Sequence, residues 1–361
     1  MSAGNRAGRP RRWLALLALA CLVGGARAEY PPVVPGTELV FPTDSGAHPD
    51  YRTEWWYVTG WVSDEAGVER GFQVTFFRVR TRIGEDNPSR FAPRQLILAH
   101  AALADPGAGR LLHAERAERA MAPLAGAATG RTHAWAGDWS LEWRDDHYRS
   151  RVEDDRFGFD LRFDPSGPPT LNGRAGFSQK APDPKHASYY YSRPQLAVRG
   201  TLRVDGATHQ VSGRAWLDHE WSSELMPEGA QGWDWIGINL HDGGALMAFR
   251  MRDDAGAAMW SAGTLREGSG LLRALAPAEV EFIPGRRWRS PRTSADYPVE
   301  WELRIAGRRL RLEPLMDDQE LDSRRSTGAV YWEGAVRLFE DGREIGRGYL
   351  EMTGYGERLR L

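Results

Sequence analysis

Cysteine and lysine are almost absent from the sequence, which contains only Cys21, Lys180 and Lys185 of these two types. Cys21 lies in an N-terminal apolar run, so a chain cleaved after that run has no thiol for a disulfide bond or for nucleophilic catalysis. The sequence also lacks a Gly-x-Ser-x-Gly motif, a glycine-rich phosphate loop and a His-Glu-x-x-His motif. These absences give no support to a serine or thiol hydrolase.

Residues 1–28 have the pattern of a secretory signal peptide. Arginines precede an apolar run from Trp13 to Val23, and Ala26-Arg27-Ala28 forms a small-x-small cleavage site. The run is too short to span a bilayer core of about 30 Å. Arg11-Arg12 is compatible with twin-arginine export and Cys21 with lipidation, but we expect a periplasmic or secreted product cleaved after Ala28.

Cleavage after Ala28 makes the chain more acidic. It removes five arginines and no acidic residue, which changes the formal net charge from −2 to −7. Nucleic acids and anionic membrane surfaces are therefore not expected as partners.

Short strand-like segments make up most of the remaining chain. Segments such as "EWWYVTGWV", "RFGFDLRF" and "ALMAFRMR" are separated by hairpin signals at Asp205-Gly206, Asp242-Gly243 and Asp341-Gly342. Fifteen tryptophans and 40 glycines also suit an aromatic-rich β protein. The one segment with a helical pattern is "LLHAERAERAMAPLAG" at residues 111–126, which Pro123 interrupts.

A weak internal repeat indicates two units. "WWYVTGWVSDEAGVERGFQVTFFRVR" and "WDWIGINLHDGGALMAFRMR" each read as a Trp-rich strand, a turn, and a strand ending in Phe-Arg-apolar-Arg. Each copy has enough chain after it for one antiparallel barrel. We expect an all-β fold of two tandem antiparallel barrels, at residues 29–195 and 196–361. The proline-rich segment before residue 196, which carries both lysines, is expected to be an exposed linker.

A cluster of polar residues stands out in "WLDHEWSS" at residues 216–223. If this segment continues a strand, His219 and Trp221 lie on one face, and Asp218 and Glu220 lie on the other. A His beside a Trp can relay a proton next to a cation-stabilising ring, and buried carboxylates have raised pKa values suited to acid or base chemistry. The alternative is a structural network in which the same groups bond the backbone.

A metal site is not predicted, because no second His lies within a few residues of His219. The remaining candidates are aromatic. Cross-strand packing explains most of these side chains, but a Trp-lined barrel can also hold one isoprenoid or acyl chain. The predicted ligand-binding residues are Trp55, Trp56, Tyr57, His100, Tyr190, Tyr191, Trp221, Trp233 and Trp235.

Several motifs occur together in an order that resembles a known family. They are "TEWWYVTGWV", "LAHAAL", "YYYSRPQLAVRGTL", "GRAWLDHEWSS", "GWDWIGINL", "LMDDQEL", "YWEGAV" and "GRGYLEMTGYGE". From about Phe41 to Tyr355 the chain resembles the carotenoid 1,2-hydratase and AttH-type family. The resemblance implies two lipocalin-like barrels and no cofactor.

The resemblance implies two possible functions. Its hydratase branch adds water to a terminal isoprenoid double bond, with a His and a Trp that correspond to His219 and Trp221. Its exported AttH-type branch often accompanies a lipoprotein-release-type ABC permease. The hydratases also use a Tyr and an Asp in the next strand pair, where this chain has Phe249 and Arg250, so Asp234 or Asp253 is a possible substitute.

Two hypotheses therefore remain. In the first, the protein adds water to an apolar ligand by hydration or hydrolysis, with Asp218 or Glu220 as the acid or base and His219 as the proton relay. Trp221, Trp233 and Trp235 would flank a cationic centre. In the second, the protein is a non-catalytic lipid carrier or an accessory subunit of an envelope exporter.

Overall fold

The computed structural model describes Met1, residues 30–356 and Arg358. Apart from Met1, the expected signal peptide lies outside the described residues. Within them, the regular structure is β apart from two short 3-10 helices, η1 (Thr43–Ser45) and η2 (Pro277–Glu279). No helix in the described part of the chain is long and apolar enough to cross a membrane. The all-β prediction is confirmed.

The first sheet has thirteen strands among the described residues and forms a nearly closed barrel, with β4 contacting β5 and β6 across the gap. Its order is β4-β3-β2-β1-β13-β12-β9-β8-β7-β6-β5, with β10 and β11 paired to β12. The strands are β1 (Thr53–Asp64), β2 (Glu69–Arg80), β3 (Gln95–Asp105), β4 (Arg110–Arg119), β5 (Ala125–Ala127), β6 (His133–Ala136), β7 (Trp139–Arg144), β8 (His147–Glu153), β9 (Phe157–Asp164), β10 (Thr170–Leu171), β11 (Phe177–Gln179), β12 (Ala187–Val204) and β13 (Ala207–Glu224).

The second sheet has ten strands in the described residues and the order β17-β16-β15-β14-β25-β24-β22-β21-β18, with β23 on β24. A separate hairpin joins β19 to β20. The strands are β14 (Gly232–Leu240), β15 (Ala245–Arg252), β16 (Ala258–Arg266), β17 (Leu272–Leu275), β18 (Val280–Pro284), β19 (Arg287–Arg289), β20 (Asp296–Pro298), β21 (Trp301–Ile305), β22 (Arg308–Pro314), β23 (Glu320–Ser323), β24 (Ala329–Glu340) and β25 (Arg343–Met352).

The sheets divide the chain between β13 and β14, whereas the sequence placed the division at residue 195. Residue 195 lies inside β12, where Gln195 has a φ of 60° and the pairing with β13 shifts between Arg193 and Leu196. Pro194 therefore lies at a bulge within a long strand, and the proline-rich segment does not end a sheet. Lys180, expected in an exposed linker, is buried.

The segment at residues 111–126 is not a helix, contrary to the sequence prediction. Residues Arg110–Arg119 form β4, which pairs along its length with β3. Ala, Glu and Arg favour a helix locally, but pairing with a buried neighbouring strand outweighs that preference. The three Asp-Gly turns occur as expected, joining β12 to β13, β14 to β15 and β24 to β25.

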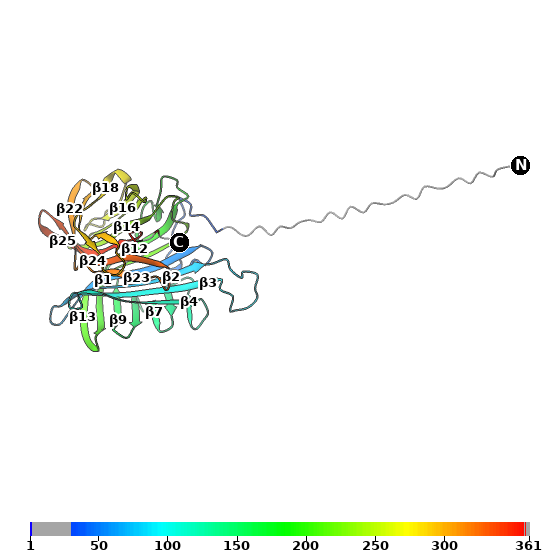
Figure 1. Ribbon diagram of the computed structural model, residues 1–361, viewed down its shortest axis with the longest axis horizontal. Helices are drawn as coiled ribbons and strands as arrows, with labels where there is room; N and C mark the ends of the chain where they lie inside the picture. The colour runs from blue at the N-terminus through cyan, green and yellow to red at the C-terminus, as the bar shows by residue number, and fades with distance from the viewer. Residues whose placement is uncertain (2–29, 357, 359–361) are drawn as a thin grey trace.

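Three apolar cores result from this arrangement. One fills the first barrel, one fills the second sheet, and the third lies between the sheets. The second sheet packs over the first, with β25 against β1 and β24 against β2 (Figure 1). Strand β1 is buried on both faces, and its alternation sends Trp56 into the first barrel and Tyr57 into the core between the sheets.

Candidate active site between the two sheets

Strand β13 separates the polar cluster in the way that its alternation predicts. His219 and Trp221 point into the first barrel, where Trp221 belongs to the barrel core. Asp218 and Glu220 point to the opposite face and line a cavity between the two sheets. The two halves of "DHEW" therefore belong to different environments.

His219 lies in a buried hydrogen-bond network inside the first barrel. Its Nε2 is 2.9 Å from Glu54 Oε1, and its Nδ1 is 3.2 Å from Tyr191 Oη. Glu54 also accepts hydrogen bonds from Arg78 Nε at 2.7 Å and from the backbone N–H of His48 at 2.9 Å. The His219 ring stacks on Trp56 at a centroid distance of 4.7 Å. These contacts fix the ring on all sides.

The electrostatics of this network favour a neutral His219 beside an ionised Glu54. Burial is the largest influence on His219 and, despite the hydrogen bond to Glu54, lowers its pKa to about 4. Burial would raise the pKa of Glu54, but hydrogen bonds from His219 and His48 and the charge of Arg78 lower it well below its ordinary value. The first barrel thus stabilises a carboxylate in its core.

The same network contains the one group of potential metal ligands that converges in the described part of the chain. Ligand atoms of His48, Glu54 and His219 lie within 4.8 Å of one another. Their hydrogen bonds to each other already use the facing lone pairs and protons, and Arg78 places a positive charge against Glu54. A cation would have to displace these interactions.

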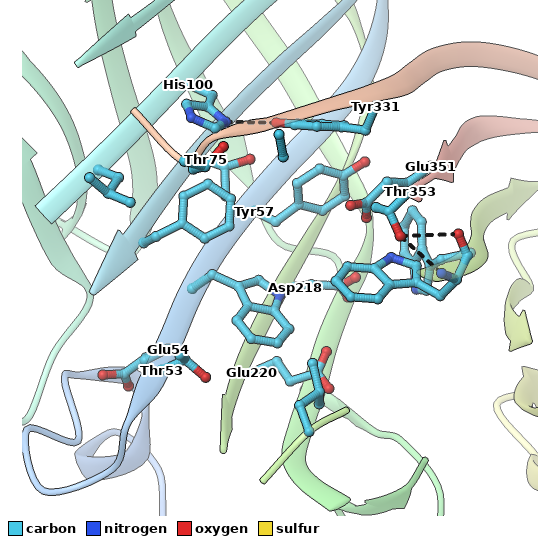
Figure 2. A pocket seen from close by; sticks show the side chains of 18 of the residues that line it. Thr53, Glu54, Tyr57, Thr75, His100, Asp218, Glu220, Tyr331, Glu351 and Thr353 are labelled. Carbon is cyan, nitrogen blue, oxygen red and sulfur yellow. Dashed lines mark hydrogen bonds between the residues drawn. The ribbon is translucent and has the colours of Figure 1, made fainter. Parts of the chain in front are cut away.

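The cavity between the sheets has a volume of about 300 Å³, within the range of small-molecule sites. Most of its walls are apolar or aromatic, but carboxyl groups enter from both sheets (Figure 2). Its lining includes Trp55, Tyr57, Phe77, Val79, Leu96, Leu98, His100, Lys180, Asp218, Glu220, Trp233, Trp235, Phe249, Met251, Tyr331, Glu333 and Glu351.

Asp218 is held by three donors. Ser192 Oγ and Trp216 Nε1 donate to its Oδ1 at 2.5 and 2.6 Å, and Tyr190 Oη donates to its Oδ2 at 2.7 Å. Burial, the largest influence, raises the pKa of Asp218 to about 7, although these hydrogen bonds oppose the shift. The carboxyl is fixed in position and can change its protonation state near neutral pH.

Glu220 forms a buried ion pair with Lys180. The two charged groups are 2.8 Å apart, and Ser188 Oγ donates to the same carboxylate oxygen. The Lys180 ammonium also lies 4.4 Å from the centre of the Phe249 ring. The negative charge of Glu220 is therefore compensated by a cation, whereas Asp218 has only neutral hydrogen-bond donors.

Glu333 and Glu351 are cavity residues that the sequence analysis missed. They occupy directly opposite positions on β24 and β25. Burial is the main influence on both, and it raises the pKa of Glu333 well above its ordinary value and that of Glu351 to about 8. The signal was present in "YWEGAV" and "GYLEMT", where a single acid interrupts an otherwise apolar strand.

His100 closes another side of the cavity (Figure 2). Its Nδ1 is 2.6 Å from Tyr331 Oη, and its Nε2 is 2.8 Å from Ser326 Oγ, so both contacts come from the second sheet and its β23–β24 connection. Burial lowers the pKa of His100 to about 3, which keeps the ring neutral.

The comparisons with known proteins cover nearly the whole chain. The AttH-like family model matches residues 32–355. The chain belongs to the AttH-like family. A crystal structure from Nitrosomonas europaea, titled as an AttH (NE1406), is 48% identical with a TM-score of 0.84, covering 90% of this chain and 99% of that one. This match confirms the lipocalin-like fold of two tandem barrels.

Two hydratases are also similar to this AttH-like chain. Kievitone hydratase from Fusarium solani subsp. phaseoli is 25% identical over 194 residues, which are 52% of this chain and 53% of that protein. The aligned segment therefore spans only about half the length of that relative. The structure of kievitone hydratase from Nectria haematococca has a TM-score of 0.68 at 16% identity, covering 91% and 97% of the two chains, and shares the fold.

The AttH-like chain brings about half of its predicted site residues to the cavity. The predicted residues that line it are Trp55, Tyr57, His100, Asp218, Glu220, Trp233 and Trp235. Tyr190 lies behind Asp218 as its hydrogen-bond donor. The predicted residues that pack inside the first barrel instead are Trp56, Tyr191, His219 and Trp221.

The two acids considered as substitutes for the hydratase Asp are not among the cavity-lining residues. Asp234 is fully buried against Arg250, at 2.6 Å, and accepts a hydrogen bond from Tyr355 Oη at 2.9 Å. Asp253 accepts the backbone N–H of Ala257 in the turn after β15. Both acids have structural partners.

Proposed function

We propose that this AttH-like protein adds water to a carbon–carbon double bond of an apolar, neutral ligand held in the cavity between its sheets. The observation that carries the proposal is Asp218, a buried carboxyl fixed by three donors in the wall of a largely aromatic cavity. No cofactor is required, because the chemistry needs only an acid, a base and cation stabilisation.

The residues have distinct roles in this reaction. Protonation of the double bond leaves a cationic carbon, which the ring faces of Trp233, Trp235 and Tyr57 stabilise by their negative quadrupoles. Water attacks that carbon, and Asp218 accepts the proton that the water loses. Because its donors hold the carboxyl in place, no reorganisation is needed when charge develops.

His219 acts indirectly in this proposal. It lies on the opposite face of β13, so it positions the strand that carries Asp218 rather than touching the ligand. The same holds for Trp221, which stacks on His48 at a centroid distance of 3.7 Å.

Two further points support a hydratase-like activity. Kievitone hydratase, the curated relative, is named for water addition. The cavity also supplies both apolar surface for a ligand and buried carboxyls for proton transfer. The ligand class we favour is an isoprenoid or another lipid, encountered in the periplasm or outside the cell after signal-peptide cleavage.

A non-catalytic carrier is the alternative, and the apolar part of the cavity favours it. Phe77, Val79, Leu96 and Leu98 form a wall that would retain a lipid without any reaction. In that case the protein would serve an envelope ABC permease as a lipid-binding accessory subunit.

The test of the proposed function compares the wild type with Asp218→Asn, using farnesol as the probe in ¹⁸O-water. We expect the wild type to form an ¹⁸O-labelled alcohol and the variant to bind farnesol without forming it. Asp160→Asn, which removes a surface carboxylate paired with Arg149, is the matched control. Equal labelling by Asp218→Asn would contradict the role of Asp218, and binding without labelling by the wild type would favour the carrier.

A further inference from the structure

We propose that Glu333 and Glu351 share one proton and that this pair donates it to the double bond of the ligand. The inference rests on the proposed function and assigns its proton donor. The two residues are direct cross-strand partners on β24 and β25, so their side chains leave the sheet on the same face. Both line the cavity, on the sheet opposite the one that carries Asp218.

Glu333 has a carboxyl oxygen with no partner. Its side chain is 1% exposed, and no described group lies at hydrogen-bonding distance and angle from Oε1. A buried carboxylate oxygen without a donor is costly, and one proton on the pair removes one of its two negative charges. Glu351 is partly exposed and both residues line the cavity, which leaves the pair open to a ligand.

The charges around the pair favour retention of a proton. In addition to burial, the negative charges of Glu220 and Asp218 raise the pKa of Glu351, and the charge of Glu351 raises the pKa of Glu333. Each neighbouring acid therefore disfavours a second negative charge on the pair. Lys180 is paired with Glu220. Burial raises the pKa values of Tyr57 and Tyr349, so both tyrosines are uncharged. Two carboxyls in such a site cannot both ionise at neutral pH.

The aspartate on the opposite wall completes the proton balance. The O–H bond of the protonated carboxyl breaks, and its proton forms a C–H bond at the less substituted alkene carbon. The more substituted carbon becomes cationic and forms a C–O bond with water, whose proton passes to Asp218. The product has gained one water, and proton transfer from Asp218 back to the pair restores the starting state.

This division of labour follows from the hydrogen bonds. Asp218 accepts three hydrogen bonds, which favours its carboxylate form and its use as the base. Glu333 Oε1 has no donor among the described groups. Tyr57 beside Glu333 and Trp233 beside Glu351 only partly offset the effect of burial, which raises the pKa of both carboxyls and favours use of the pair as the acid.

Infrared spectroscopy tests the shared proton without any ligand. The full-length protein, labelled with ¹³C at glutamate carboxyls, should show the carbonyl stretch of a protonated glutamate at pH 7. Glu333→Gln and Glu351→Gln should each shift that band, because burial keeps the remaining glutamate protonated while the carboxylate that shares its proton is gone. Glu340→Gln and Glu344→Gln lie on the same two strands but form surface ion pairs with Arg308 and Arg347, so they should retain it. A wild-type protein without the band would overturn the proposal.

Hydration of farnesol in deuterated water tests the transfer. The wild type should place deuterium on one face of the alkene carbon, and each Gln variant at the pair should lower the rate about 100-fold or more. The two surface variants should keep the wild-type rate. Thermal denaturation of each variant distinguishes a lost donor from a lost fold.

The outcomes separate the two proposals. Full turnover by folded Glu333→Gln and Glu351→Gln would overturn the donor role while leaving the hydratase intact. A wild type that shows the infrared band but never hydrates would refute the hydratase and the donor role together, and would leave only the shared proton.

Discussion

Asp218 and Glu220 are two residues apart on one strand but have opposite electrostatic environments. Glu220 has a cation at 2.8 Å, whereas Asp218 has only neutral donors. Because a neutral donor compensates burial less than a charge does, the pKa of Asp218 rises and Glu220 stays paired. Two acids on one face of the same strand therefore differ in what compensates their burial, which is a cation for Glu220 and neutral donors for Asp218.

The pH dependence of hydration should be bell-shaped and narrow. Asp218 must be a carboxylate to accept a proton, so the rate should rise as pH increases through about 7. The Glu333–Glu351 pair must keep a proton, so the rate should fall above about pH 8. A pH series of initial rates with farnesol checks this, and a rate that keeps rising to pH 10 would contradict the acid assignment.

The buried His219 gives a stability prediction. His219→Ala should lower the free energy of unfolding by about 3 kcal/mol, because it opens a void against Trp56 and deprives Glu54 of a donor. Farnesol binding by the folded variant should remain within a few fold of wild type. Urea unfolding and tryptophan-quenching titrations measure the two effects. His219→Gln, which keeps an N–H donor, should recover part of the lost stability.

Strand β1 offers the sharpest test at the level of an element, because consecutive tryptophans point to opposite faces. Trp55 lines the cavity, whereas Trp56 is fully buried in the first barrel. Trp55→Ala should weaken farnesol binding about 10-fold with a small loss of stability. Trp56→Ala should cost about 3–5 kcal/mol of stability. The reverse pattern in binding and unfolding measurements would show that the cavity does not hold the ligand.

Strand periodicity predicted much of the fold and part of the site. The alternation in "WLDHEWSS" gave the correct faces for Asp218 and His219, because a strand buried on both sides still alternates strictly. It could not show which face adjoins a cavity, since that depends on the packing of the second sheet against β1 and β2.

Other elements could not be predicted locally. Strand β4 has a helix-forming composition, and only its partner β3 makes it a strand. The pairing of Glu333 with Glu351 depends on the register of β24 and β25. The turn at Asp341-Gly342 does not determine that register alone, because a bulge near Leu338 shifts the pairing between the turn and the two glutamates. Lys180 lies in the connection after β11, outside the regular strands, and its ion pair with Glu220 on β13 forms only in the folded chain.

At the scale of the whole molecule, the cavity exists because two sheets pack against each other. Each sheet alone has a core of its own, and the shared core between them holds the cavity. Gly71 on β2 marks the close approach, since a side chain there would lie 2.5 Å from Tyr349 Oη and 2.6 Å from Ala335 Cβ. The chemistry thus depends on carboxyls contributed from both sides of one interface.

The combined charge of the two sheets predicts ligand selectivity. The acids that line the cavity are Glu54, Asp218, Glu220, Glu333 and Glu351, of which Glu54 is paired with Arg78 and Glu220 with Lys180. A neutral ligand such as farnesol should therefore bind at least about 10-fold more tightly at pH 7 than the corresponding carboxylate, farnesoic acid. The difference should shrink at pH 5, where the ligand and the cavity acids take up protons. Equal affinities at pH 7 in quenching titrations would contradict this charge argument.

The most direct test of the account is incubation of the mature protein with farnesol and, separately, a bacterial membrane-lipid extract in ¹⁸O-water, followed by mass spectrometry. If the cavity hydrates its ligand, wild type and Asp160→Asn should introduce ¹⁸O into an alkene-containing ligand, and Asp218→Asn should not. A ligand that is retained by all three proteins without any label would contradict water addition and would make this AttH-like protein a carrier.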